Sequence, residues 1–202
     1  MQTLELQIYS YNDIEREKIA GEGETYLVEK CTVNKEIVAV KHLKIGSAAA
    51  DDPKFLRRLN SVMLELRIMH HPPLQNHPNI LTLLAYGWNT QQNSILPYVI
   101  VEYSPLGNLR EYIRNRNVVT MLEREMLIGD VASGLRALHL SKIIHGDVKL
   151  ENVLVFPCWD RPCDCIAKIS DFGHSLLLDS IKTTSNIVYW GSPLYVMSVS
   201  GI

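Results

Sequence analysis

An apolar stretch interrupted by charged residues constrains this chain more than any other feature: "IIHGDVKLENVLVF", residues 143–156. The segment reads as core sequence on both sides of Asp147, Lys149 and Asn152. Burying such groups without partners costs on the order of several kcal/mol, so they need something to hold. The interruption therefore predicts a functional loop inserted between two buried segments.

Composition and charge narrow the class of protein that could carry such a loop. The chain has 202 residues, of which 47% are hydrophobic and 21% charged, with a formal net charge of −2. This length suits one large domain or two small lobes. The near-neutral charge predicts no nucleic-acid partner and no binding to anionic lipid. No signal peptide or bilayer-spanning apolar run is present in the sequence, so we expect a soluble, cytoplasmic protein without membrane association.

Four cysteines do not form a recognisable framework. Cys31 stands alone, whereas Cys158, Cys163 and Cys165 crowd into "PCWDRPCDC". A zinc site with three thiolates, completed by His174, is one interpretation, but the paired CxxC spacing typical of zinc sites is missing. We therefore favour a surface loop with reduced thiols.

Hydrophobic periodicity predicts strands in the first half of the chain and helices in the second. Residues 53–69 carry apolar side chains at helical spacing, and a second helical pattern begins at Thr120, which stands in capping-box spacing with Glu123. The predicted strands lie within residues 31–43, 79–88 and 96–103. This pattern predicts a two-lobed α+β fold, with a strand-rich lobe over about residues 1–103 and a helical lobe over about residues 104–202.

Lys41 and Glu65 are candidates for one buried ion pair. Lys41 ends the alternating stretch "IVAVK", and Glu65 shares a side of the predicted helix with Val62 and Met69, the side expected to face the core. An unpaired carboxylate there would cost on the order of several kcal/mol, so Lys41 is its natural partner. A lysine held in this way is available to a third group such as a phosphate; a purely structural ion pair is the alternative.

Oxygen-bearing side chains follow two short apolar stretches of the second half. Asp147 and Asn152 follow one stretch, and Asp171 follows the next, in "IAKISDFG". Each of them alone is typical of a turn. Together, two carboxylates and an amide suit a magnesium–phosphate site, because hard cations take oxygen ligands.

These motifs, taken in order, resemble the eukaryotic protein kinase superfamily from about residue 14 to about residue 195. "GEGETYLV" is similar to the family's glycine-rich loop, "VAVK" to its lysine strand, "VIVEYS" to its hinge, "HGDVKLEN" to its catalytic loop and "DFG" to its metal-binding motif. "HGDVK" also resembles kinase-like proteins of filamentous fungi. The resemblance implies a protein kinase domain over residues 1–202, with ATP and Mg2+ as cofactors and a protein as substrate.

The resemblance also implies a role for each matched residue. Asp147 would be the catalytic base, Lys149 would lie beside the transferred phosphate, and Lys41, held by Glu65, would anchor the phosphates of ATP. The implied ATP-binding residues are Gly21, Gly23, Val28, Ala39, Lys41, Val101, Glu102, Ser104 and Leu154. The implied magnesium ligands are Asn152 and Asp171. The implied regulatory spine consists of Met69, Leu83, His145 and Phe172.

Three departures from the family pattern carry predictions of their own. Tyr26 stands where the third loop glycine is usual, which predicts altered closure of the loop on phosphate and weaker ATP binding. Gly146 replaces the arginine that usually precedes the base, so we expect no control through phosphorylation at Thr183, Thr184 or Ser185. The stretch "PCWDRPCD" enlarges the segment before Asp171 and predicts an exposed hairpin tip.

Two further predictions concern the amino acid that accepts the phosphate and the C-terminal end of the domain. Lys149, two residues after the base, is typical of serine/threonine kinases. Residues 191–195, "GSPLY", resemble the substrate-facing end of the activation segment, after which the family continues with Ala-Pro-Glu but this chain reads "VMSVSGI". We therefore expect a serine/threonine kinase domain with an incomplete, C-terminally truncated helical lobe. The alternative is a truncated or pseudokinase fragment that binds nucleotide or protein partners without phosphotransfer.

Overall fold

Most strand residues lie in the first half of the chain and the longest helix in the second, which confirms the predicted α+β class, although the second half also contains four short strands among the described residues. The computed structural model describes residues 11–44, 53–91, 94–116 and 118–178. The chain divides into two compact units, the first formed by Met1–His70 with Thr82–Tyr103 and the second by His71–Leu81 with Ser104–Ile202.

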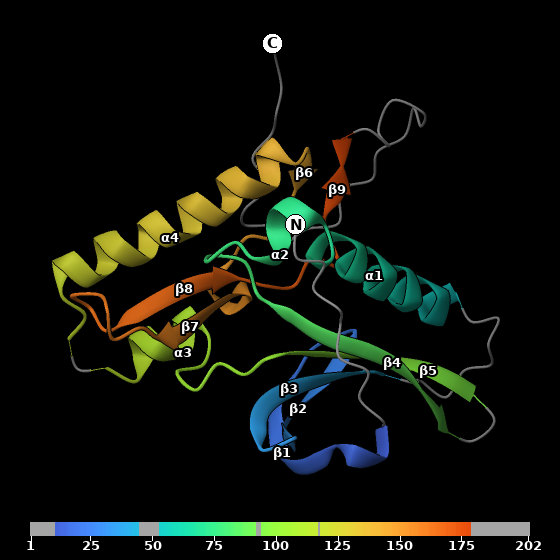
Figure 1. Cartoon of the computed structure of the whole chain (residues 1–202). Helices are drawn as coiled ribbons and strands as arrows, with labels where there is room; N and C mark the ends of the chain where they lie inside the picture. Colours follow the sequence, from blue (N-terminus) through green and yellow to red (C-terminus); the bar gives the residue numbers. More distant parts are fainter. Residues whose placement is uncertain (1–10, 45–52, 92–93, 117, 179–202) are drawn as a thin grey trace. The chain divides into compact units, whose positions relative to one another are not determined.

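The first unit is a five-stranded antiparallel sheet with one long helix and a short 3-10 helix (Figure 1). Its elements are η1 (Tyr11–Asp13), β1 (Glu15–Glu22), β2 (Tyr26–Val33), β3 (Glu36–Leu43), α1 (Pro53–Met69), β4 (Leu83–Gln91) and β5 (Ser94–Glu102). The strand order is β1-β2-β3-β5-β4. Asn34 and Lys35 take φ values of 51° and 69° between β2 and β3, so the predicted Asn-Lys turn is confirmed as a tight two-residue hairpin.

The two faces of this sheet have different roles. Strand residues alternate between faces, so one set of side chains forms an apolar core on one side. That core contains Cys31, Val33, Val38, Val40, Ala85, Tyr98 and Ile100. The opposite face carries Lys41 and is contacted by α1, whose buried side includes Glu65 and Met69. The expectation that Glu65 faces the core is confirmed.

The strand predicted over residues 79–88 begins later than the sequence indicated, at Leu83. The residues before it pair with β8 instead: the Leu81 N–H donates to the Ile169 carbonyl, and the Ile169 N–H donates to the Asn79 carbonyl, each at 2.9 Å. Residues 79–81 therefore belong to the second unit. Because the apolar sequence of residues 79–88 is continuous, it does not show that the backbone of residues 79–81 pairs with a different strand from the residues that follow.

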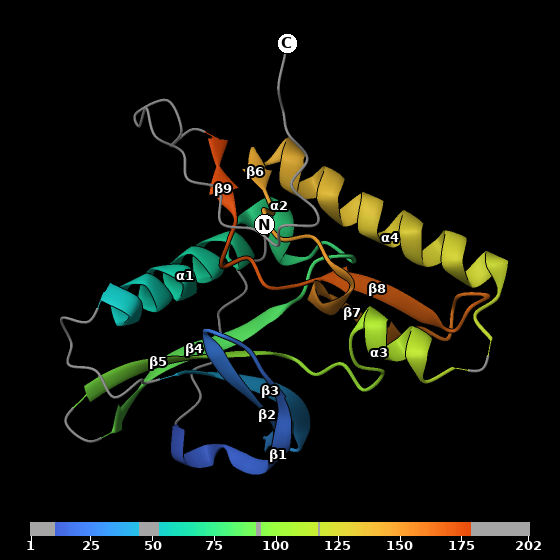
Figure 2. The same cartoon turned by 180° about the vertical axis from the view of Figure 1, so that it is seen from behind.

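The second unit combines helices with short two-stranded sheets (Figure 2). Its elements are α2 (Pro72–Gln75), α3 (Leu109–Arg114), α4 (Met121–Leu140), β6 (Ile143–Ile144), η2 (Leu150–Asn152), β7 (Val153–Pro157), β8 (Cys165–Ile169) and β9 (Leu176–Leu177). The predicted capping box begins α4: Thr120 Oγ1 accepts from the Glu123 N–H, and the Glu123 side chain accepts from the Thr120 N–H.

A hairpin of β7 and β8 packs against α3 and α4 and contains the enlarged segment (Figure 2). Their shared core contains Leu109, Tyr112, Leu127, Val153, Val155, Cys165 and Ala167. Trp159, at the tip, is 79% exposed, which confirms the predicted exposed hairpin. No helix in the described part of the chain is both long and apolar enough to span a bilayer.

Candidate active site

Lys41 and Glu65 form the ion pair that the sequence predicted. Lys41 lies on β3 and Glu65 on α1, with Lys41 Nζ 2.5 Å from Glu65 Oε1. Glu65 is fully buried, and its Oε2 has no hydrogen-bond partner among the described residues, so Lys41 is what neutralises this carboxylate. Removing one partner of such a pair leaves a buried charge, at a cost of about 3–5 kcal/mol. The pairing is confirmed, whereas the phosphate-anchoring role of Lys41 stays a prediction.

Four other residues predicted to bind ATP share a face of the sheet with Lys41. Val28 lies opposite Lys41 in the β2–β3 register, and Gly21 lies opposite Val28. Ala39, two residues before Lys41, lies opposite Val101. Residues paired across strands, or two apart along a strand, project to the same face. This face therefore presents a small apolar surface beside a lysine, which suits a flat ring attached to a phosphate chain.

Neither Gly21, near the end of β1, nor Gly23, in the loop between β1 and β2, is required by the local fold. A Cβ atom added to Gly21 or Gly23 would meet no atom within 4 Å, and neither glycine has a positive φ. The turn is closed by a 2.9 Å hydrogen bond from the Gly23 N–H to the Tyr26 carbonyl. Neither packing nor a positive φ demands glycine here, and a residue without a side chain would let a ligand approach the backbone closely; that role stays a prediction.

Tyr26, which stands in place of the third loop glycine, is buried rather than turned to solvent. Its side chain is 6% exposed, and Lys41 Nζ lies 4.2 Å from the centroid of its ring. The sequence indicated only that a bulky residue would alter closure of the loop. The contact with Lys41 was missed, although the predicted β2–β3 hairpin would have indicated it once the strand register was known.

The interrupted segment holds Asp147, Lys149 and Asn152 together in the second unit. Asp147 is 4% exposed, and its Oδ2 accepts hydrogen bonds from Lys149 Nζ at 2.5 Å and from Asn152 Nδ2 at 3.0 Å. Asn152 Nδ2 also donates to the Asp147 carbonyl at 2.9 Å. A carboxylate, a cation and an amide are thus held in one small network; the role of Asp147 as the base stays a prediction.

The two predicted magnesium ligands have side-chain oxygens suited to a hard cation. Both hydrogen bonds of the Asn152 amide use Nδ2, which leaves Oδ1 as an acceptor. The Asp171 carboxylate forms no hydrogen bond or ion pair with any described residue, and Asp171 has a φ of 62°. A left-handed backbone at a residue other than glycine is uncommon and clusters at ligand sites. Carboxylate and amide oxygens fit Mg2+.

His145 connects the predicted catalytic loop to the segment that carries Asp171. Its Nδ1 accepts from the Asp147 N–H at 3.3 Å, and its Nε2 lies 3.0 Å from the Ser170 carbonyl. Nε2 therefore carries the proton, and the ring is neutral. Burial lowers the pKa of His145 from its ordinary value, opposed by the hydrogen bond to Ser170. The ring also lies 5.4 Å from that of Phe172, centroid to centroid, as predicted for this half of the spine.

The two predicted hinge residues use their side chains for structure. Glu102 Oε1 accepts from the Thr82 N–H at 2.7 Å, at the end of β5. Ser104 Oγ donates to the Val155 carbonyl at 2.5 Å. Leu154, beside Val155 on β7, is half-buried. These side-chain contacts were not predicted, because the hinge role involves only the backbone atoms of Glu102 and Ser104; that role stays a prediction.

Gly146, next to the predicted base, is fixed by geometry. It has a φ of 81°, and an added Cβ would lie 2.2 Å from the His174 carbonyl oxygen. An arginine is therefore incompatible with this backbone. The candidate phosphorylation sites Thr183, Thr184 and Ser185, and residues 191–195, lie outside the described residues.

Cys158 and Cys163 lie in the tip of the β7–β8 hairpin, as the predicted surface loop requires, whereas Cys165 is buried at the start of β8. Cys158, Cys163 and Cys165 are free thiols, and Cys163 Sγ donates to the Cys165 carbonyl at 3.2 Å. Among the described residues, no group of three or more His, Cys, Asp or Glu side chains is arranged to hold a metal ion. The zinc interpretation, with His174 as fourth ligand, gains no support from the part of the chain that is described.

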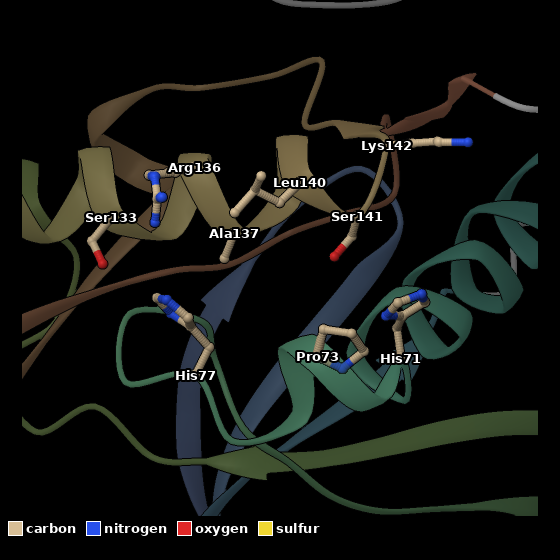
Figure 3. Close-up of a pocket in the computed structure, with 9 residues that line it drawn as sticks. All are labelled: His71, Pro73, His77, Ser133, Arg136, Ala137, Leu140, Ser141 and Lys142. Carbon is tan, nitrogen blue, oxygen red and sulfur yellow. The ribbon is translucent and has the colours of Figure 1, made fainter.

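A separate cavity of about 500 Å³ lies in the second unit (Figure 3). Ser133 and Arg136 of α4 lie above His77, and Ser141 lies above Pro73 and His71. None of its lining residues is a predicted ATP or magnesium ligand. The lining residues are His71, Pro73, His77, Ser133, Arg136, Ala137, Leu140, Ser141 and Lys142.

Comparison with known proteins identifies the class. The protein kinase domain family matches residues 14–197, so the chain belongs to this family. The chain is 27% identical over 184 residues to mouse (Mus musculus) NUAK family SNF1-like kinase 1, covering 90% of this chain and 25% of that protein. It is 32% identical over 189 residues to mitogen-activated protein kinase kinase kinase mkh1 of Cytospora mali, covering 87% of this chain and 9% of that protein.

A third relative is serine/threonine-protein kinase atg1 of Dictyostelium discoideum, 29% identical over 161 residues, with 80% of this chain and 22% of that protein covered. The chain therefore spans a quarter or less of the length of these three relatives. The predicted kinase-like α+β fold with a β-rich first lobe and the predicted resemblance to fungal kinases are both confirmed.

Proposed function

We propose that this chain binds ATP with Mg2+ and transfers the γ-phosphate to serine or threonine hydroxyls of a protein substrate. The observation that carries the proposal is the buried network in which Asp147 accepts from both Lys149 and Asn152. The buried Lys41–Glu65 pair supports it. Phosphoryl transfer requires positioning and charge neutralisation more than covalent chemistry, and these groups supply both.

In the proposed reaction, Asp147 accepts the proton of the substrate hydroxyl. The hydroxyl oxygen forms a bond to the γ-phosphorus, while the bond from that phosphorus to the β,γ-bridging oxygen breaks and ADP leaves. Lys149 would neutralise charge on the transferred group, and Lys41 would bind the remaining phosphates. Gly21, Gly23, Val28, Ala39, Val101 and Leu154 would surround the nucleotide, with the Glu102 carbonyl and the Ser104 N–H facing adenine.

Asn152 Oδ1 and the Asp171 carboxylate would hold Mg2+. The bound ion would neutralise the negative charge of the phosphates. Among the described residues, Asn152 Oδ1 and the Asp171 carboxylate have no hydrogen-bond partner, and Asp171 has a left-handed backbone; both observations support this assignment. His145 keeps both segments in place through Asp147 and Ser170.

Nucleotide binding can be tested by titrating a fluorescent ATP analogue with and without Mg2+. Wild-type protein is expected to bind only weakly without Mg2+, and a Lys41→Met, Asp171→Asn double variant is expected to lose most of the binding. Equal binding by wild type and double variant would contradict the proposal.

The proposed preference for serine or threonine rests on Lys149 and on the similarity to serine/threonine kinases such as atg1 of Dictyostelium discoideum. Incubation of the protein with radiolabelled ATP and a peptide library, beside an Asp147→Asn control, is expected to yield phosphoserine and phosphothreonine that depend on Asp147. Phosphotyrosine as the main product would overturn this part.

We also propose that the protein acts in the cytoplasm. Its cysteines are free, as is usual where glutathione keeps thiols reduced.

A further inference from the structure

Strand register places Tyr26 against Lys41. In the β2–β3 pair, Tyr26 lies opposite Leu43, and Lys41 precedes Leu43 by two residues. Tyr26 and Lys41 are therefore diagonal neighbours on one face of the sheet, a spacing that aromatic and long side chains bridge. The contact follows from the pairing of the hairpin and needs no unusual backbone.

The Tyr26 ring covers one side of the Lys41 ammonium group, and Glu65 lies on another. Lys41 Nζ lies 2.5 Å from Glu65 Oε1 and 4.2 Å from the centre of the Tyr26 ring. Both Tyr26 and Lys41 are nearly excluded from solvent, at 6% and 7% exposure. Cation–π attraction is stronger when the cation is desolvated, so the ring is a favourable partner for this lysine.

A phosphate oxygen needs direct contact with the ammonium, at about 2.7–2.9 Å. Glu65 lies on one side of the ammonium and the Tyr26 ring on another, and Lys41 is only 7% exposed, so the ring covers surface that a phosphate oxygen would use. By contrast, Ala39 and Val101 lie on the same face but on the other side of Lys41 from Tyr26 along β3, with Val28 level with Lys41.

We propose that Tyr26 is an intramolecular competitor for the phosphate position at Lys41. This inference rests on the proposed function. The resting protein then accepts a nucleoside on the apolar face but resists the phosphate chain, so ATP binds only when the Tyr26 side chain swings away from Lys41. Tyr26 is thus a specificity-determining residue that removes the advantage a triphosphate normally has over adenosine.

A simple packing role for Tyr26 would give a different result. If Tyr26 only filled space in the sheet, its truncation would weaken all ligands together or leave them unchanged. If it competes with phosphate, truncation would strengthen only those ligands that carry phosphate.

The test compares wild type, Tyr26→Ala and Tyr26→Phe by calorimetric titration with adenosine, Mg-ATP and inorganic tripolyphosphate. Tyr26→Phe keeps the ring over Lys41 and serves as the matched control. We expect Tyr26→Ala to bind Mg-ATP and tripolyphosphate about tenfold more tightly, which corresponds to about 1.4 kcal/mol. Adenosine affinity should change less than about twofold, and Tyr26→Phe should behave as wild type.

The outcomes separate this inference from the proposed function. Unchanged affinity of folded Tyr26→Ala for both phosphate-bearing ligands would overturn the inference. If no variant binds adenosine or Mg-ATP, the proposed function fails, and the tripolyphosphate comparison still decides whether Tyr26 competes at Lys41. Should Tyr26→Ala unfold, Tyr26→Leu replaces it, because leucine keeps apolar bulk in the strand but has no π face; the same increase is expected, and its absence counts against the inference.

Discussion

At the scale of single residues, the backbone conformation at position 146 requires glycine. The neighbouring Asp147 is not the reason. Its φ of 81° is unfavourable for any residue with a Cβ, and that Cβ would meet the His174 carbonyl oxygen at 2.2 Å. Restoring the usual arginine by Gly146→Arg is therefore expected to reduce the free energy of unfolding by at least about 2 kcal/mol. Urea denaturation measures this change.

Gly129→Ala is the matched control for Gly146→Arg. Gly129 lies within α4, and an added Cβ would meet nothing within 4 Å. Alanine there should stabilise the protein by about 0.5–1 kcal/mol. A Gly146→Arg variant as stable as wild type would mean that the segment around His174 moves readily, and would contradict the claim that the backbone here requires glycine.

A second residue-scale prediction concerns pH. Burial lowers the pKa values of His145, His42 and His77 below the ordinary 6.5, and nearby carboxylates only partly oppose this shift for His145 and His42. Below pH 6.5 the unfolded chain binds protons that the folded chain resists. The free energy of unfolding should therefore fall as pH falls below about 6.5, by up to about 1.4 kcal/mol per pH unit for each histidine.

Thermal or urea denaturation between pH 7.5 and pH 5.5 tests this dependence. The carboxylates of Asp147 and Asp171 and the ring of His174 also influence His145, so removal of His145 itself is the informative variant. His145→Gln should lessen the slope of stability against pH without abolishing it, since His42 and His77 remain. An unchanged slope would show that His145 does not titrate as its burial requires.

At the scale of elements, Asp130 joins α4 to the β7–β8 hairpin. Its Oδ2 accepts from the Ala167 N–H at 2.9 Å and from Arg161 Nη1 at 2.7 Å, and Asp130 is 8% exposed. Asp130→Ala leaves a buried N–H without a partner, which should cost about 2–3 kcal/mol of unfolding free energy. Urea denaturation of Asp130→Ala is compared with Asp160→Ala, at an exposed position of the same hairpin. Equal stability of the two variants would contradict this role.

Capping signals illustrate how far elements could be predicted from the sequence. The start of α4 was predictable because Thr120 and Glu123 satisfy each other's backbone N–H groups locally. Helix α3 was missed, although Asn108 and Glu111 form the same kind of capping box at its start. The signal was present, but α3 is only six residues long and shows too few turns for a hydrophobic period.

At the scale of the whole molecule, the spacing of residues in the sequence was enough to predict the candidate site. It was not enough to predict which residues distant in sequence contact one another. Asp147, Lys149 and Asn152 lie close in sequence, so their assembly into one network was predictable. The contact of Tyr26 with Lys41 depends on strand register, and the bond from Ala167 to Asp130 joins residues 37 apart. Such pairings are decided by tertiary packing, which periodicity alone does not encode.

Among the described helices, the apolar side chains with the highest exposed fractions lie on α4. Met121 and Ile128, seven residues apart and therefore on one face, are 68% and 69% exposed, and Leu140, near the end of α4, is 70% exposed. Burial of one such side chain contributes about 1.5–3 kcal/mol, and contiguous exposed apolar patches promote association. Residues 1–202 are therefore expected to self-associate as concentration rises, as measured by light scattering.

A double substitution, Met121→Lys with Ile128→Lys, should suppress this association, because it removes apolar area and adds repulsive charge on the same helix face. The control is Asn60→Lys with Asn115→Lys, which adds equal charge at exposed positions elsewhere and leaves the apolar face intact. If both double variants scatter less light to the same degree, net charge explains the effect. If wild type stays monomeric at all concentrations, the exposed face of α4 does not drive association, and the prediction is wrong.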